Sequence, residues 1–181
     1  MDWKRMMIMS LENVKEHFKQ WNRADEIMEF ETSSATVEQA ADTIGVIPAR
    51  IAKTLSFRGV EEKAILIVTA GDAKIDNKKF RQTFGFKARM LTLDEVSEQT
   101  GHVIGGVCPF GLKNELDVYL DVSMKRFESV FPACGSTNSA IELTNDEIRE
   151  YSFAKEWVNV CKGWDEPLNS EKIEVSKNGR S

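Results

Sequence analysis

A single lysine, Lys53, lies at the opening of an otherwise apolar segment, which has the sequence Ile-Ala-Lys-Thr-Leu-Ser-Phe at residues 51–57. Burying an ammonium group is costly unless the group has a partner or a chemical task. Periodicity alone favours a lysine whose stem crosses the sheet edge and whose charge reaches solvent. The alternative is a fixed cation that binds a phosphate or carbonyl oxygen, or a lysine of lowered pKa.

A glycine-rich stretch at residues 101–111 has the sequence Gly-His-Val-Ile-Gly-Gly-Val-Cys-Pro-Phe-Gly. A backbone of this composition can approach a ligand closely and present N–H groups to an oxyanion or a terminal adenosine. It is not a phosphate-binding P-loop, because Leu112 follows Gly111 where that motif has a lysine. A tight connection between strands remains the alternative. The small polar residues at 133–139 indicate, by themselves, only a turn.

Other arrangements suggest weaker hypotheses. Cys108 and His102 could form a thiol nucleophile and its base, but the sequence does not show whether the chain folds back to join them. Asp117 and Asp121 fall on one face of a predicted strand, where a solvated pair is favoured over a paired-carboxylate or metal site. The motifs of serine hydrolases and zinc proteases are not found.

Basic residues gather at 74–89, although the formal net charge of the chain is -5. Lys74, Lys78 and Arg81 have the spacing of one helical face, with Lys79 beside them. Such a run is usually a solvated surface. It is also the place where this acidic protein could most readily hold an RNA backbone.

The elements that must position these residues alternate along the chain. Capping patterns and apolar periodicity predict helices at 11–21 with Ser10 as N-cap, 36–45, 76–84, 92–101, 123–129 and from 144, with a short helix starting at Pro48. Strands are expected at 26–31, 52–57, 63–69, 87–91, 117–121, 140–143 and 157–160. The fold class is therefore mixed α/β in a single compact domain, followed by a flexible polar tail at 166–181.

Composition sets further bounds. With 181 residues, 41% apolar and 29% charged, the chain matches one soluble globular domain. The apolar runs are too short to cross a membrane, and the N-terminus lacks the features of a signal peptide, so a cytoplasmic protein is expected. Three scattered cysteines argue against a disulfide framework and a structural zinc site.

Taken in chain order, these stretches resemble the YbaK/EbsC-type family of aminoacyl-tRNA deacylases, which also supplies the editing insertion of bacterial prolyl-tRNA synthetases. The resemblance covers residues 36–160, about 70% of the chain, and rests on the order and spacing of several motifs. They are Thr-Val-Glu-Gln-Ala-Ala at 36–41 with Gly45, Ile-Ala-Lys-Thr-Leu at 51–55, residues 65–71, the loop at 105–111, Val-Tyr-Leu-Asp at 118–121 and Cys-Gly-Ser at 134–136.

The resemblance implies a compact domain around a curved mixed sheet, spanning 35–165, with 1–34 as an N-terminal helix and strand extension. It implies hydrolysis of the ester between a wrong, small amino acid and tRNA, with mischarged tRNA and possibly a synthetase as partners. DNA, membranes, cofactors and metals have no part in it. Lys53 is the implied catalytic residue. The implied substrate-binding residues are His102, Gly105, Gly106, Val107, Cys108, Pro109, Phe110, Gly111, Asp121, Gly135 and Ser136.

The expected mechanism uses neither a covalent intermediate nor a metal, because an aminoacyl ester is already activated and mainly needs orientation and a polarised carbonyl. RNA contacts are expected at Lys74, Lys78, Lys79 and Arg81. Two alternatives stay open at this point. One is a non-catalytic module of the same fold that binds tRNA or a synthetase, and the other is a thiol hydrolase that uses Cys108.

Overall fold

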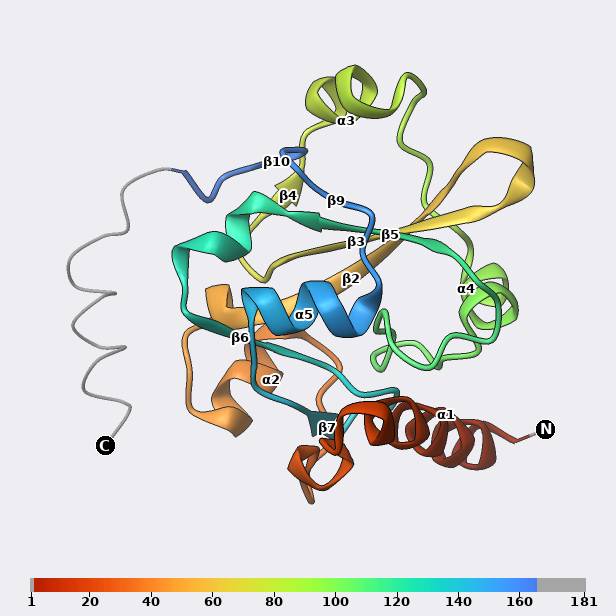
Figure 1. The fold of residues 1–181 in the computed structure, drawn as a ribbon, viewed down its shortest axis with the longest axis vertical. Coiled ribbons are helices and arrows are strands. Elements are labelled where there is room, and N and C mark those ends of the chain that lie inside the picture. Colours follow the sequence, from red (N-terminus) through yellow and green to blue (C-terminus); the bar gives the residue numbers. More distant parts are fainter. Residues whose placement is uncertain (1, 166–181) are drawn as a thin grey trace.

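The computed structural model describes residues 2–165, which form one mixed α/β domain around a curved sheet of six strands in the order β8-β6-β2-β3-β5-β9 (Figure 1). The fold class predicted from the sequence is thus confirmed. At the centre, β2 (Ile51–Arg58) and β3 (Ala64–Ala70) form an antiparallel hairpin, and all seven residues of β3 are buried. A strand covered on both faces needs such a continuous apolar run.

The strands on either side extend the sheet in both directions. On one side, β5 (Asp117–Asp121) pairs parallel with β3, and β9 (Glu156–Val158) pairs parallel with β5. On the other side, β6 (Ser129–Pro132) runs parallel to the start of β2, and β8 (Leu143–Thr144) pairs antiparallel with β6. In the described residues, two short antiparallel strand pairs lie outside the six-stranded sheet. In the first, β1 (Met28–Glu29) pairs with β7 (Ser139–Ala140), and in the second, β4 (Lys74–Ile75) pairs with β10 (Cys161–Lys162).

Most helices begin and end where their capping residues predict. The helices are α1 (Trp3–Phe18), α2 (Val37–Ile44), α3 (Asn77–Phe84), α4 (Leu93–Thr100) and α5 (Asn145–Ser152). Thr36, Asp76, Thr92 and Thr144 each accept a hydrogen bond from the backbone N–H three residues later. Short 3₁₀ helices occupy Lys19–Trp21, Ala24–Glu26, Pro48–Arg50, Val60–Glu62 and Val122–Arg126.

Several expectations about single elements were wrong. The first helix begins at Trp3, capped by Asp2, so Ser10 is a buried residue inside it and not its N-cap. The segment at 87–91 is not a strand, because it touches β2 at only one bridge, between Phe57 and Met90. Three strands, β4, β6 and β10, were not predicted. The first predicted strand extends beyond β1, and β7 and β8 were predicted as one strand. The expected tail at 166–181 lies outside the described residues.

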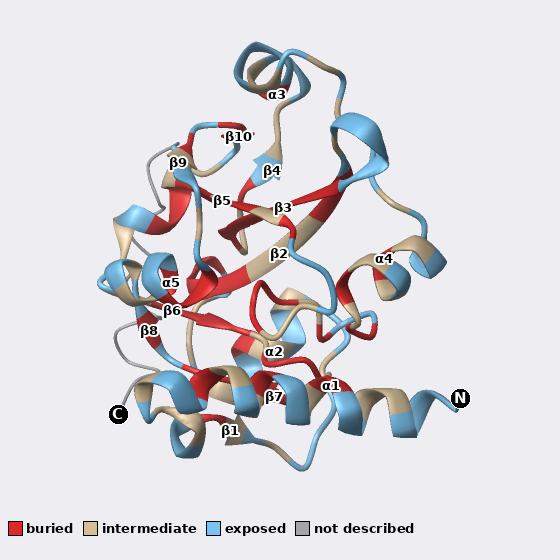
Figure 2. Ribbon diagram, turned by 45° about the vertical axis from the view of Figure 1, so that its right-hand side comes forward, coloured by how far each residue is buried: buried red, intermediate tan, exposed pale blue. Residues whose placement is uncertain are grey.

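The core lies around β3, which is buried along its whole length, and around both ends of β2, whose middle is only partly buried (Figure 2). Its largest fully buried side chains include Phe18 of α1, Phe57 of β2, Phe80 of α3 and Phe110 of the glycine-rich loop. These contacts tie α1 and α3 to the same sheet. Within residues 2–165, no helix has the length and apolar character needed to cross a membrane.

Candidate functional site

The cavity of interest opens where the central sheet is incomplete. β6 pairs with β2 only at Ile51 and Ala52. Further along the same edge of β2, residues 89–91 take over, with Leu91 N donating to Ser56 O (3.1 Å) and Arg58 N donating to Arg89 O (2.8 Å). A cavity of about 350 Å³ lies against β2 between these two contacts. Its volume falls within the range of about 300–1,000 Å³ that is usual for small-molecule sites.

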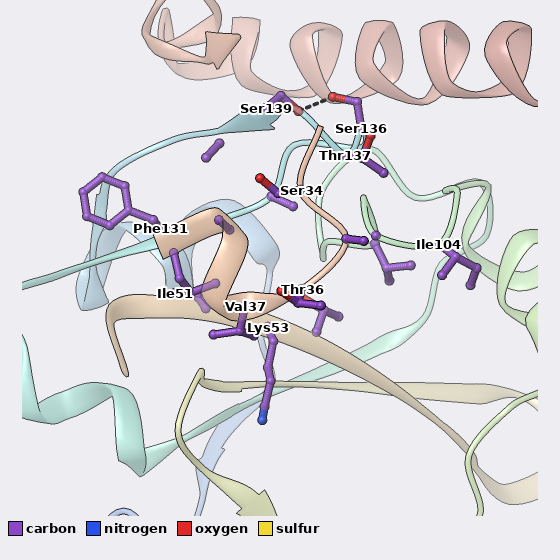
Figure 3. A pocket seen from close by; sticks show the side chains of 18 of the residues that line it. Ser34, Thr36, Val37, Ile51, Lys53, Ile104, Phe131, Ser136, Thr137 and Ser139 are labelled. Atoms are coloured by element: carbon purple, nitrogen blue, oxygen red, sulfur yellow. Dashed lines mark hydrogen bonds between the residues drawn. The ribbon is translucent and has the colours of Figure 1, made fainter. Parts of the chain in front are cut away.

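Three stretches that are far apart in the sequence meet at this cavity. Lys53 comes from β2, Gly105 and Val107 from the glycine-rich loop, and Ser136 from the polar turn before β7. The walls differ in character (Figure 3). Ser136, Thr137 and Ser139 lie together and form a hydroxyl-bearing wall. The other labelled lining side chains are the apolar Val37, Ile51, Ile104 and Phe131, the hydroxyl-bearing Ser34 and Thr36, and Lys53.

Lys53 lines the cavity, but its ammonium group is turned away from the hydroxyl-bearing wall (Figure 3). Side chains alternate along a strand, so Lys53 shares a face of the sheet with Phe57, which packs on Phe80 at 5.1 Å between ring centroids. Lys53 Nζ donates to the carbonyl of Gly71 at 3.3 Å, a long hydrogen bond. Half-burial of the side chain lowers the pKa of Lys53, and nearby acidic groups only partly offset this effect.

The glycine-rich loop forms part of the cavity wall because its backbone packs directly against other backbone. Gly105 has φ +87°, and a Cβ there would lie 2.8 Å from the Thr137 methyl group. A Cβ on Gly106 would lie 2.5 Å from the carbonyl carbon of Gly135. Behind this contact, a Cβ on Gly135 would lie 2.7 Å from the carbonyl oxygen of Ser10 in α1. Loop, turn and helix therefore stack without side chains between them.

His102 joins the two ends of this loop and attaches them to α1. Its Nε2 lies 2.7 Å from the carbonyl of Phe110, which can only accept, so Nε2 carries the proton. Nδ1 is then an acceptor, and Ser10 Oγ donates to it at 2.5 Å. Burial of the ring lowers the pKa of His102. His102 therefore lies behind the cavity wall and does not line it.

The fold does bring Cys108 and His102 together, with 3.6 Å between Sγ and Nε2. Both side chains are fully buried, and burial raises the pKa of the Cys108 thiol to about 12. A thiol in this state is not a nucleophile at neutral pH. Gly106, Pro109 and Phe110 are buried with Cys108 behind the wall, and a Cβ on Gly111 would lie 2.7 Å from the carbonyl oxygen of Asn13 in α1.

Two expected groups lie away from the cavity. Asp121 is fully buried and accepts backbone N–H bonds from Ser123 and Val160, each at 2.9 Å, so the expectation of a solvated pair with Asp117 was wrong. Lys74 lies on β4 and not on α3, so it shares no helical face with Lys78 and Arg81. Among the described residues, none of Lys74, Lys78, Lys79 and Arg81 lines the cavity.

Neither α2 nor the hydroxyl-bearing wall was predicted from the sequence to be part of the site. Thr54 was also missed, although it lines the cavity and its buried Oγ1 has no hydrogen-bond partner. In the described part of the chain, no three His, Cys, Asp or Glu side chains are grouped so that they could hold a metal ion. The site therefore offers hydroxyl groups, backbone groups and one lysine.

Comparison with known proteins agrees with this picture. The family described as "Aminoacyl-tRNA editing domain" matches residues 31–151. The uncharacterized protein YwhH of Bacillus subtilis is 70% identical over 157 residues, covering 87% of this chain and 100% of that protein. EbsC of Enterococcus faecalis, a proposed Cys-tRNA(Pro)/Cys-tRNA(Cys) deacylase, is 29% identical over 114 residues, covering 62% of this chain and 70% of EbsC. The crystal structure of a proposed trans-editing enzyme for prolyl tRNA synthetase has a TM-score of 0.77 at 28% identity, covering 85% and 98% of the two chains.

Proposed function

This chain belongs to the aminoacyl-tRNA editing domain family, and from that premise we propose that it hydrolyses the ester of mischarged aminoacyl-tRNA in trans, in the cytoplasm. The observation that carries the proposal is the convergence of Lys53, the Gly105–Val107 part of the loop and Ser136 on one cavity. The substrate would be a small amino acid, because a cavity of about 350 Å³ must also admit part of the terminal ribose. The names of EbsC and of the trans-editing enzyme suggest tRNA for proline, and a synthetase as a further partner.

The chemistry that these residues could perform needs no covalent intermediate. Within residues 2–165, the N–H groups of Gly105 and Val107 make no hydrogen bond, so they are available to the oxygen of a polarised ester carbonyl. Donors placed at a developing oxyanion each contribute about 2.7–4 kcal/mol to such reactions. Water would attack the carbonyl carbon, the bond between that carbon and the ribose oxygen would break, and the ribose oxygen would leave with the proton that the water gives up. The neighbouring ribose hydroxyl would orient the water or relay this proton.

Lys53 would act by exchanging partners. Its bond to Gly71 is long and involves a neutral carbonyl, whereas a bond to a charged or strongly polarised oxygen of the substrate would be shorter and stronger. The half-buried stem already lines the cavity, and in this proposal rotation about side-chain bonds would bring the ammonium group to the substrate. Lys53 would then fix the terminal adenosine or the ester oxygens.

The RNA backbone would bind outside the cavity. Lys78 and Arg81 are exposed on α3, and with Lys74 and Lys79 they keep the proposed RNA-binding role. After α3 the chain passes through two further exposed basic residues, Lys87 and Arg89. It then reaches Met90 and Leu91, which line the cavity, so Lys87 and Arg89 extend the basic surface toward the site. Replacing them should weaken tRNA binding at low salt more than at high salt.

The experiment is a panel of radiolabelled mischarged tRNAs, with Ala-, Cys- and Ser-tRNA for proline among them, incubated with wild type and Lys53→Ala. Release of one amino acid by wild type, lost in Lys53→Ala, is the expected result. Lys155→Ala is the matched control, because Lys155 forms a surface ion pair with Asp117 at 3.2 Å. Wild-type rates in Lys53→Ala would refute the role of the lysine. Binding of tRNA without release from any of them would favour a non-catalytic binding module.

A further inference from the structure

The hydrogen bonds of β2 show which of its backbone groups point toward the gap in the sheet. Successive residues of a strand direct their N–H and C=O groups to opposite edges. On the edge shared with β3, the hairpin closes with Gly59 N donating to Lys63 O at 2.9 Å, so odd-numbered residues bond to β3. Even-numbered residues bond on the other edge, as the contacts of Ser56 and Arg58 with residues 89–91 show.

Thr54 is the even-numbered residue that falls in the gap. β6 pairs with β2 as far as Ala52, and the next contact on this edge is made by Ser56. In the described chain, Thr54 therefore has no strand partner for its N–H and C=O groups on the side of the cavity. Its Oγ1 is also buried without a partner, and the residue lines the cavity.

A buried hydroxyl group without a partner, such as Thr54 Oγ1, is rare in folded proteins, because it costs free energy. An open strand edge is also a known template for binding another extended chain through main-chain hydrogen bonds. Ser56 lies four residue steps along the strand from Ala52, which at about 3.4 Å per step is roughly 14 Å. The open part of the edge is thus long enough for one extended residue and its two hydrogen bonds.

We propose that Thr54 binds the aminoacyl group of the substrate as a one-residue strand partner. The carbonyl of Thr54 accepts a hydrogen bond from the α-amino group, and the N–H of Thr54 donates to the ester carbonyl. This inference rests on the proposed function and names how the substrate is held. An aminoacyl ester carries an amine donor and a carbonyl acceptor in the same arrangement as a residue in a strand, which matches the two open groups.

This mode of binding has a consequence for selectivity. The main chain recognises the amine and the carbonyl, which all aminoacyl esters share, while the side chain of the amino acid is selected by the cavity walls. An acyl group without the amine would lose one of the two strand-like hydrogen bonds. A hydrogen bond to a charged amine typically changes affinity by about tenfold or more.

The test is nuclear magnetic resonance on the full chain with 3′-alanylamino-3′-deoxyadenosine, in which an amide replaces the labile ester. Binding should move the Thr54 amide proton downfield and slow its exchange with solvent at least tenfold. The amide of Leu55 is the internal control, because it bonds to β3 and should not change. Binding that leaves the Thr54 amide unchanged, or failure of the analogue to bind, would overturn the proposal. Because the readout is not activity, this result is independent of whether mischarged tRNA is hydrolysed.

A second pair of measurements separates the main chain from the Thr54 hydroxyl group. The des-amino analogue, 3′-propionylamino-3′-deoxyadenosine, should bind at least tenfold more weakly than the alanyl compound to wild type and to Thr54→Val. This variant removes Oγ1 and keeps both main-chain groups. Loss of the discrimination in Thr54→Val would show that the hydroxyl group recognises the amine, and equal binding of the two compounds to wild type would equally contradict the proposal.

Discussion

Gly106→Ala tests how the wall of the cavity is held in place. The new Cβ would lie 2.5 Å from the carbonyl carbon of Gly135 and 2.6 Å from the nitrogen of Ser136. Ordinary contacts begin near 3.4 Å, so loop and turn must separate by about 1 Å, and both are backbone. Overpacking of this kind costs about 1–3 kcal/mol of stability. A displacement of 1 Å in a site can lower a rate about 100-fold.

The matched control is Gly85→Ala at the end of α3. Gly85 has φ +82° with nothing within 4 Å of the added Cβ, so only the left-handed backbone costs free energy, about 1–2 kcal/mol. Urea unfolding should therefore show similar losses of stability in the two variants. Single-turnover release of the amino acid, measured on the tRNA that wild type hydrolyses best, should fall about 100-fold in Gly106→Ala alone. A folded Gly106→Ala protein with the wild-type rate would refute the reasoning.

Three further predictions follow from ionisable groups. Burial lowers the pKa of His17 and of His102 from 6.5, so below that pH the unfolded chain binds more protons than the folded chain. The free energy of unfolding should therefore drop between pH 7 and 5.5. The drop should be smaller in His17→Gln and in His102→Gln. A flat pH profile in wild type would contradict this. Cys108→Ser should keep its activity in the release assay, because the thiol pKa of about 12 leaves no thiolate at neutral pH, and loss of activity would support the thiol mechanism. Burial lowers the pKa of Lys53 from 10.5. The rate of amino-acid release, corrected for spontaneous hydrolysis, should therefore decline in alkali at a pH below the one at which an ordinary lysine loses its proton. An active Lys53→Arg variant should lack this decline, because arginine stays charged.

The helices were the most predictable part of the fold, because their ends are specified by local chemistry. Thr92 and Thr144 form complete capping boxes with glutamates three residues later, and both were recognised from the sequence. Gly45 and Gly85 end α2 and α3 in the left-handed conformation that glycine adopts readily. Ser10 was predicted as an N-cap because serine favours that position, but it lies inside α1, where its hydroxyl group donates to His102.

The prediction of a strand at 87–91 was wrong for a different reason. Exposed Lys87 and Arg89 alternate with half-buried Ala88, which is the pattern of a half-buried strand. However, a strand also needs a partner along its length, and this segment meets β2 at a single bridge. Asp121 could not be assigned from the sequence either, since its role depends on the N–H of Val160, which is far away in the chain.

The site was predictable in its parts and less so in its geometry. The lysine, the loop and the polar turn were recognised through family resemblance, and the structure brings them to one cavity. The direction of the Lys53 side chain follows from the face of β2 on which the residue lies, and this face is known only once the strand is placed against α3. The open edge at Thr54 depends on where β6 ends its pairing, which no local pattern encodes.

The close packing of α1 against Gly111 and Gly135 has a practical consequence for the choice of fragments to express. The family-matched range of 31–151 omits α1 and β9, although Val14 and Phe18 of α1 are fully buried. A fragment cut to that range would expose the backbone of Gly111 and Gly135 and leave an apolar hollow where the helix had been. The range that the family model matches is therefore smaller than the unit that folds. Fragments meant for expression should keep α1 and extend through β10.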